Sequence, residues 1–252
     1  ATPGCQILIA KDGNIFFNKS FGYHTYDKKV LVKNSDVFDL ASVTKIGATI
    51  PILMHMIDNE RFNLDNRLGM YLDLDSTDKG GLLIRDILAH QAGLIAWIPF
   101  YKRTLVKDSV FGNMNLRDTL YSKIFSKQYP HKVANSIFLH KQYPDSIIKQ
   151  IKKSDLLEKR KYLYSDLGYY MFKEIIEKAY IKPLNVVADE LFYKRLGMEN
   201  FGYLPLQRIE ENRILPTAMD FVFRSQLLRG YVHDQGAAIQ AGVGGHAGLF
   251  SN

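Results

Sequence analysis

The segment Phe38-Asp39-Leu40-Ala41-Ser42-Val43-Thr44-Lys45 joins a short apolar approach to a Ser-x-x-Lys tetrad. The residues that follow, from Val43 to about Asn59, are apolar at most positions, which predicts a buried helix. Pro51 within this helix predicts a kink or a late start. Ser42 and Lys45 are three residues apart and share one helix face, so the amine can reach the hydroxyl. A partly dehydrated lysine there can serve as the base that a serine nucleophile needs.

The Ser-x-x-Lys spacing alone is a weak signal, because it recurs at residues 76–79 and 146–149. The first repeat lies in a polar loop, and the second opens a lysine-rich, hydrated helix face. Only Ser42 lies between an apolar approach and a helix that we expect to be buried. Taken by itself, the tetrad still favours a simpler interpretation, in which Ser42 is a helix N-cap and Lys45 is a surface lysine.

A second polar cluster, Tyr164-Ser165-Asp166, comes directly before an amphipathic pattern that predicts a helix up to Tyr180. In the simpler interpretation, Asp166 or Ser165 caps that helix and Tyr164 is a packed aromatic with an exposed hydroxyl. In the functional interpretation, Tyr164 is a phenol beside a cation and passes a proton to and from the serine.

The composition is that of an ordinary globular chain and excludes several classes of protein. The chain has 252 residues, of which 46% are hydrophobic and 23% charged, so it is not disordered, collagen-like or a disulfide scaffold. No apolar run approaches the roughly 20 residues of a membrane helix. The single cysteine, Cys5, excludes an internal disulfide, and the histidines lack zinc-ligand spacing, so we expect neither a metal nor another cofactor. The net charge of +7 is densest at 149–161, where acidic residues interrupt it, so we do not expect nucleic-acid binding.

The order of strand and helix patterns predicts an α+β fold, an antiparallel sheet plus a mainly helical region with the site in the cleft between them. The patterns Gln6–Ala10 and Ile15–Phe21 flank an Asp-Gly turn and predict a hairpin. Helices are predicted at 83–90, 116–125, 147–161, 166–180 and 185–196. We therefore expect a single domain over 1–252, with the hairpin and approach at 1–40, the mainly helical region at 41–235 and a glycine-rich segment at 236–252 that returns toward the sheet.

Two aromatic residues and one histidine lie near this expected cleft. Trp97 and Tyr101 belong to an aromatic-rich loop that follows the turn at Gly93, and we expect them to line the mouth of the cleft. His90 lies at the end of a predicted helix, where a cation is favoured by the helix dipole, and we interpret it as structural.

Five sequence blocks together resemble one family. They are the nucleophile segment at 38–45, LIRDILAHQAGL at 83–94, YSDLGY at 164–169, GYVHD at 230–234 and GGHAGLFS at 244–251. In content and order they resemble the serine β-lactamase and penicillin-binding-protein-like superfamily, in particular the branch of class C β-lactamases and related serine hydrolases. A narrower resemblance is to the β-lactamase-like domain appended to family 3 glycoside hydrolases in Bacteroidetes-type bacteria.

This resemblance implies a β-lactamase/transpeptidase-like fold and a mechanism. Ser42 would attack a carbonyl to form an acyl-enzyme, with Lys45 and Tyr164 sharing the general-base and general-acid roles. The implied activity is that of an esterase, amidase or D-amino-acid peptidase on peptidoglycan-derived or small acyl substrates. The alternatives are a true β-lactamase and a catalytically weak accessory or binding domain. The resemblance also implies a periplasmic or other extracytoplasmic location and a covalently linked glycoside hydrolase domain in the full-length protein.

One departure from the family pattern concerns the supporting residue Asp166, which stands where the family usually has Asn. A carboxylate only accepts hydrogen bonds and adds charge. It would pair with Lys45, hold that lysine in its charged form and make it a poorer base. It would also repel the carboxylate of classical β-lactams, so the sequence disfavours efficient β-lactamase activity.

A second departure concerns the family's third motif, Lys/His-Thr/Ser-Gly. His246-Ala247-Gly248 is the nearest match, but only four residues follow it, too few for the remaining strands. We therefore favour an interpretation in which this block opens the next helix, with Ser251 as its cap. The domain would then lack the C-terminal strands and a flanking N-terminal helix. In the alternative, His246 supplies the third-motif cation as a supporting residue and the site is nearly complete.

Overall fold

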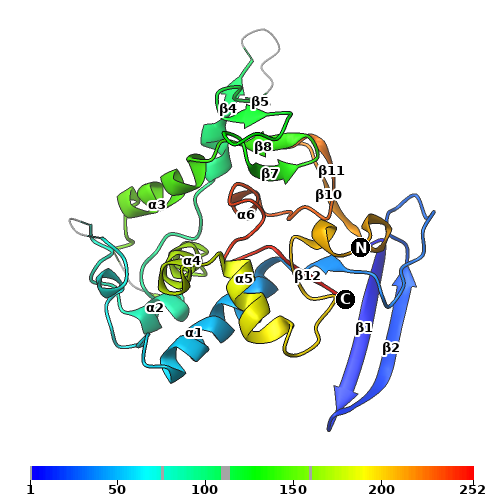
Figure 1. Cartoon of the computed structure of the whole chain (residues 1–252), viewed down its shortest axis with the longest axis horizontal. Coiled ribbons are helices and arrows are strands. Elements are labelled where there is room, and N and C mark those ends of the chain that lie inside the picture. Colours follow the sequence, from blue (N-terminus) through cyan, green and yellow to red (C-terminus); the bar gives the residue numbers. More distant parts are fainter. Residues whose placement is uncertain (1, 75–76, 109–113, 159–160) are drawn as a thin grey trace.

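The computed structural model describes residues 2–74, 77–108, 114–158 and 161–252 (Figure 1). Strands β1 (Gly4–Lys11) and β2 (Asn14–Gly22) form the predicted antiparallel hairpin. Asp12 and Gly13 both have positive φ, as a tight hairpin turn requires. The hairpin projects from one side of the molecule, with exposed apolar side chains on both faces, among them Ile7 and Leu8. The second Ser-x-x-Lys tetrad begins at Ser76, outside the described residues.

The nucleophile segment enters its helix through two tight preliminary turns. Residues Ala41–Val43 form a 3₁₀ turn and Lys45–Thr49 a π-helical turn, before the regular helix α1 (Ile50–Asp58) begins. This late start was one of the two outcomes predicted from Pro51. Proline has no N–H to donate to the carbonyl of Gly47, and the hydroxyl of Tyr193 donates to that carbonyl instead, at 2.7 Å.

The expectation that this helix is buried on all sides is only partly correct. Its inner face contributes Ile52, Leu53 and Met56 to the core, whereas Ile46 and Met54 on the other face are exposed. The pattern of apolar residues therefore overstated how much of the helix is covered.

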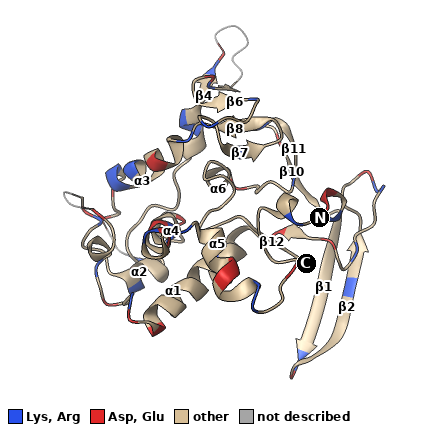
Figure 2. Ribbon diagram, in the orientation of Figure 1, with Lys and Arg blue, Asp and Glu red and all other residues tan. Residues whose placement is uncertain are grey.

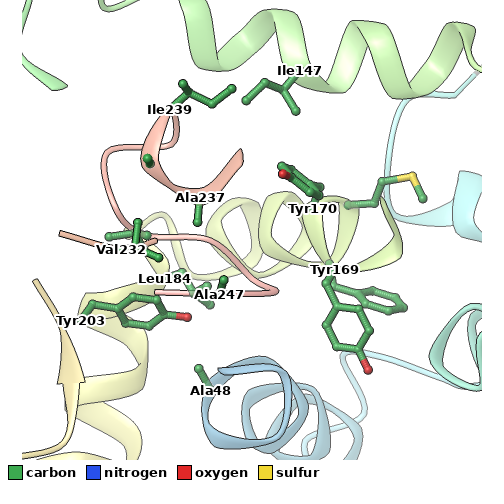
Figure 3. Close-up of a cluster of buried hydrophobic side chains, with 14 of the residues drawn as sticks. Ala48, Ile147, Tyr169, Tyr170, Leu184, Tyr203, Val232, Ala237, Ile239 and Ala247 are labelled. Carbon is green, nitrogen blue, oxygen red and sulfur yellow. The ribbon is translucent and has the colours of Figure 1, made fainter. Parts of the chain in front are cut away.

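The core of the helical region is built around α4 (Leu167–Tyr180), which Figure 1 shows among α1, α2 (Ile84–Leu88), α3 (Tyr143–Lys153) and α5 (Leu184–Ala188). A π-helical turn at Asp189–Tyr193 extends α5, and α3 begins and ends earlier than predicted. Gly168 packs so closely on α2 that an added Cβ would lie 2.3 Å from a methyl carbon of Ile87. Figure 3 shows aromatic side chains of α4 among the buried residues of this core.

A three-stranded antiparallel sheet links the nucleophile segment to the end of the chain. Strand β12 (Leu249–Ser251) lies between β3 (Phe38–Asp39) and β9 (Gly202–Tyr203). Ser251 is the last residue of that strand, and its role as the cap of a following helix stays a prediction. The glycine-rich segment thus ends in a strand beside β3, in a sheet separate from the β1–β2 hairpin.

Short strands occupy part of the middle of the chain. A three-stranded sheet contains β6 (Tyr121–Ser122), β8 (Ile137–Leu139) and β7 (His131–Ala134), and two-stranded pairs join β4 (Leu105–Lys107) to β5 (Met114–Leu116) and β10 (Pro216–Asp220) to β11 (Gln226–Arg229). The helix predicted at 116–125 is wrong, because Tyr121 pairs with Leu139 and its hydroxyl donates to Thr104 at 2.9 Å. Region 41–235 therefore holds strands as well as helices.

Two features of the whole chain bear on the function classes considered above. None of the helices in the described part of the chain has the length and apolar character that crossing a bilayer requires. Lysine and arginine residues are distributed over several elements, α3 and β2 among them, with acidic residues between them (Figure 2).

Candidate active site

Ser42 lies exposed in the 3₁₀ turn that follows β3. The preceding residue, Ala41, has a positive φ of 45°, an unusual conformation for a residue with a Cβ. Asp39 holds this turn, because one of its carboxylate oxygens accepts from the amide of Ala41 at 2.8 Å and the other from the amide of His233 at 2.7 Å. Burial raises the pKa of Asp39, although both amides act to lower it. Asp39 is a positioning residue that the sequence analysis did not single out.

Lys45 is the centre of the site, and only 3% of it is exposed. Its ammonium group donates hydrogen bonds to Ser42 Oγ at 3.0 Å, Tyr164 Oη at 2.7 Å and Asp166 Oδ1 at 2.6 Å. An ammonium group has three protons, and each of the three has an acceptor here. The structure thus brings together four residues that the sequence singled out, from two segments about 120 positions apart.

Of the simpler interpretations, only the one in which Ser165 caps α4 describes what a side chain does. Asp166 stands at the N-cap position of α4, but its carboxylate makes no capping hydrogen bond and binds Lys45 instead. The hydroxyl of Ser165 accepts from the amide of Leu167 and donates to the carbonyl of Ile95 at 2.7 Å. Ser42 makes no side-chain cap, and Lys45 is not a surface lysine.

Two aromatic rings lie beside the Lys45 ammonium group, and a third ring packs on one of them. The nitrogen lies 4.7 Å from the centre of the Tyr164 ring and 5.3 Å from that of Tyr169. Burial raises the pKa of Tyr169 to about 12, so this phenol stays protonated at neutral pH. The ring of His90 lies 4.5 Å from the ring of Tyr164. Lys45 is therefore held between π faces as well as hydrogen-bond acceptors.

His90 has a closer relation to the site than its position at a helix end suggested. Its Nδ1 accepts a hydrogen bond from the amide of Ser165 at 3.1 Å, which places any proton of the neutral ring on Nε2. Burial, followed by the charge of Lys45, lowers the pKa of His90. His90 is thus an imidazole packed on the face of Tyr164, and a helix-end position carries no signal that would have revealed this contact.

The structure places His246 away from the Lys45 cluster. No hydrogen bond joins it to Ser42, Lys45, Tyr164 or Asp166 among the described residues. Its Nε2 lies 2.8 Å from Asp234 Oδ1, and its ring stacks on Tyr170 with centres 4.2 Å apart. Asp234 also caps α6 (Gln235–Ala238) by accepting from the amide of Ala237. Burial acts to raise the pKa of Asp234, but His246 and the amides of the α6 turn outweigh it and hold that pKa well below its usual range.

Trp97 and Tyr101, the two residues expected at the cleft, line one cavity beside Asp166. This cavity has a volume of about 240 Å³ and is also lined by Tyr170, Asp234 and residues next to them in the chain. Trp97 is more than half exposed, whereas Tyr101 is buried. The described residues contain no cluster of three or more histidine, cysteine or acidic side chains that could hold a metal ion.

The glycine-rich segment is fixed against the nucleophile helix. Thr49 donates to the carbonyl of Gly245 at 2.7 Å, and Thr44 accepts from the amide of Leu249 at 3.0 Å. On its other side, Gly245 is so close to α4 that an added Cβ would lie 2.2 Å from the carbonyl oxygen of Tyr169. The segment therefore lies between α4 and the nucleophile helix and contacts both.

Comparison with known proteins gives consistent matches along the chain. The family model described as Beta-lactamase matches residues 1–252. A curated relative, the N-acetylmuramyl-L-alanine amidase of Bacillus subtilis, is 28% identical over 278 residues, which cover 99% of this chain and 56% of that protein. The chain spans a little more than half the length of the curated relatives it matches.

Solved structures show the same fold at low sequence identity. A β-lactamase/D-alanine carboxypeptidase from Yersinia pestis superposes with a TM-score of 0.64 at 17% identity, over 99% of this chain and 60% of that one. EstCE1, described as a hydrolase with promiscuous acyltransferase activity, has a TM-score of 0.64 at 20% identity, over 99% of this chain and 64% of that one. At these identities the likeness establishes the α+β architecture.

Proposed function

The chain belongs to the β-lactamase family, and on that premise we propose that it is a serine hydrolase that forms an acyl-enzyme on Ser42. The observation that carries the proposal is the position of the buried Lys45 ammonium group, within hydrogen-bond distance of Ser42, Tyr164 and Asp166 at once. A cation in contact with both a serine hydroxyl and a phenol is the arrangement that can move a proton away from the serine.

We propose different roles for Lys45 and Tyr164 in the proton transfer. An ammonium group has no lone pair, so the charged Lys45 cannot take the serine proton itself. In its deprotonated form the oxygen of Tyr164, which Lys45 contacts at 2.7 Å, can take that proton. Before that transfer the Lys45 ammonium group stabilises the negative charge on Tyr164, while Asp166 accepts another of its hydrogen bonds.

The proposed reaction has two halves. As Ser42 Oγ bonds to the substrate carbonyl carbon, its proton moves to the Tyr164–Lys45 pair, and the same proton passes to the leaving group as the old bond to that carbon breaks. Water then attacks the acyl-enzyme by the reverse sequence of proton transfers. The amide of Ser42, in the first turn of its helix, is one donor for the oxyanion.

The substrate class that we propose is an ester, amide or D-amino-acid peptide, either small or derived from peptidoglycan. The name of the amidase relative supports a cell-wall amide and an extracytoplasmic location. The carboxylate of Asp166, next to Ser42 and Lys45, argues against efficient turnover of classical β-lactams, which carry a carboxylate of their own. A linked glycoside hydrolase domain stays a prediction from the sequence.

Intact-mass spectrometry tests the nucleophile directly. The chain is incubated with a fluorophosphonate and, separately, with a penicillin, beside Ser42→Ala and the matched control Ser146→Ala. Ser146 has the same Ser-x-x-Lys spacing but lies on α3. We expect one fluorophosphonate adduct on the parent chain and on the control, and none on Ser42→Ala.

The penicillin arm separates the candidate activities. An adduct from the fluorophosphonate alone supports an esterase or amidase site, and adducts from both reagents support a site that also recognises penicillin. A folded parent chain that forms no adduct with either reagent would overturn the proposal and favour the non-catalytic accessory domain.

A further inference from the structure

The cavity beside Asp166 has walls that suit a positively charged group. The rings of Trp97, Tyr101 and Tyr170 line it, and the carboxylates of Asp166 and Asp234 belong to its lining as well. Aromatic faces and carboxylates both attract cations, and the attraction grows where water is partly excluded. Tyr101 and Tyr170 are both buried, so the inner part of the cavity is shielded from solvent.

Tyr170 provides an independent sign that this cavity accepts a ligand. Only 4% of Tyr170 is exposed, yet its hydroxyl has no hydrogen-bond partner among the described residues. The ring of Tyr170 contacts the rings of Phe100 and His246. A Cβ added to Gly236 would lie 1.8 Å from that hydroxyl, so the oxygen lies against a residue of the cavity wall. Figure 3 shows the Tyr170 ring extending from α4 toward the segment that carries Ala237. Because this hydroxyl has no partner within the described part of the protein, its oxygen is available to a donor that enters the cavity.

Among the described residues, those that line the cavity include two carboxylates and no lysine, arginine or histidine. Lys45 balances Asp166 through the 2.6 Å contact. Asp234 contacts His246, whose Nδ1 is buried without a partner. His246 contacts Asp234 through Nε2, and Asp234 also accepts from the amide of Ala237 at 2.7 Å. Arg224, the cation whose charge also acts on Asp234, is paired with Asp220 at 2.7 Å. Asp166 and Asp234 therefore bring two carboxylates to the cavity, and a cationic ligand would be attracted to both.

We propose that this cavity is the subsite for an ammonium group on the substrate, with Asp234, the Tyr170 hydroxyl and the ring of Trp97 as its contacts. The proposal rests on the function proposed above and narrows its substrate class to acyl compounds that carry a free amine near the scissile bond. The volume of about 240 Å³ is enough for an amine together with a short side chain.

Trp97 makes the proposal testable without any catalysis, because it is the single tryptophan of the chain. Its fluorescence is titrated with D-alaninamide, which carries an ammonium group, and with the neutral N-acetyl-D-alaninamide and the anionic N-succinyl-D-alaninamide. We expect a saturable change with the ammonium compound at concentrations at least tenfold below those needed for the neutral one, and none with the anion. Equal affinity for the first two compounds, or no saturable change with any of them, would overturn the proposal.

Variants show which groups bind the amine. Tyr170→Phe removes the unpartnered hydroxyl, and we expect the affinity for D-alaninamide to fall about tenfold, as for a lost hydrogen bond to a charged group. Asp234→Asn keeps an acceptor for the α6 cap and removes the charge, and it should abolish the preference for the ammonium compound. Asp145→Asn, an exposed carboxylate on α3, is the matched control and should leave the affinity unchanged. A preference that survives in Asp234→Asn would contradict the assignment of Asp234.

The preference for a free amine is also measured in catalysis, by comparing hydrolysis of D-alanyl and N-acetyl-D-alanyl p-nitroanilides. Together with the fluorophosphonate adduct on Ser42, this preference separates the subsite proposal from the serine hydrolase proposal on which it rests. A fluorophosphonate adduct on Ser42 without a preference for the free amine would overturn the subsite and leave the serine hydrolase standing. An ammonium preference in the Trp97 titration without any adduct on Ser42 would keep the subsite and overturn the hydrolase.

Discussion

The contact between Gly236 and Tyr170 predicts that Gly236→Ala destabilises the parent chain but is neutral or slightly stabilising in the Tyr170→Phe variant. In Gly236→Ala, the new Cβ would lie 1.8 Å from the Tyr170 hydroxyl and 3.1 Å from the ring carbon that bears it. Tyr170 cannot swing away easily, because His246 stacks on one side at 4.2 Å and Phe100 packs at 5.3 Å. The substitution therefore has to shift either the ring or the α6 turn.

The magnitude follows from two opposing terms. Overpacking a buried site costs about 1–3 kcal/mol. Replacing glycine by alanine within a helix stabilises by about 0.5–1 kcal/mol, because the unfolded chain has less freedom to lose. The net effect of Gly236→Ala is then a destabilisation of about 1 kcal/mol, which lowers the Tm of a domain of this size by about 2–4 °C.

The Tyr170→Phe background removes the clashing oxygen. The hydroxyl has no hydrogen-bond partner, so Tyr170→Phe alone should be close to neutral. Within that background the alanine at 236 should be neutral or slightly stabilising. Urea unfolding compares four chains in a double-mutant cycle: the parent, the two single variants and the double variant. We expect a coupling energy of about 1–3 kcal/mol.

The result that would refute this reasoning is a small coupling energy. If Gly236→Ala destabilises the parent and the Tyr170→Phe chain equally, with coupling below about 0.5 kcal/mol, the two residues do not meet as described. The Tyr170 hydroxyl would then not lie at the cavity wall, and the ammonium subsite would lose one of its contacts.

Three further predictions concern the site and its charges. Lys45→Met should slow fluorophosphonate acylation of Ser42 about 10²–10⁴-fold in time-resolved mass spectrometry, whereas Lys149→Met on α3 should not; equal rates would contradict the role of Lys45. The pKa of Asp234 is lower in the folded chain than in the unfolded chain, so the contribution of Asp234 to stability is present above about pH 4 and lost as the pH falls further. Asp234→Asn should therefore make the free energy of unfolding, measured with urea, depend less on pH between about pH 5 and 2. Because burial lowers the pKa of His90 in the folded chain, the unfolded chain binds a proton at His90 more readily, and the free energy of unfolding falls as the pH drops below about 6.5. His90→Gln should make this fall with pH less steep. An unchanged pH dependence would contradict a lowered pKa for His90.

Asp166, which stands where the family usually has Asn, has contacts on two sides of the site. Asp166 contacts Lys45 at 2.6 Å and also lines the cavity that we assign to an ammonium group. One carboxylate thus faces the proton-transfer residues on one side and the proposed substrate subsite on the other. An amide at this position could accept the Lys45 hydrogen bond but would bring no charge to the cavity.

Local patterns in the sequence were enough to predict several elements. The hairpin followed from Asp-Gly between two alternating runs, because only a few residues adopt positive φ easily. The amphipathic period predicted α4 to within one residue. The family resemblance, carried by short motifs at Ser42, Lys45 and Tyr164, agrees with the family match along the chain. These features depend on neighbours within a few positions of each other.

Tertiary structure alone decided the rest. The strand at Tyr121 replaced a predicted helix because its partner, Leu139, lies in another segment. The contacts of Lys45 with Tyr164 and Asp166, and the packing of His90 on Tyr164, join residues dozens of positions apart. Hydrogen-bond geometry, desolvation and the balance of charges depend on distances in space. A sequence can name the residue types that could make such contacts, whereas the packing of α4 against the nucleophile helix brings them within bonding distance.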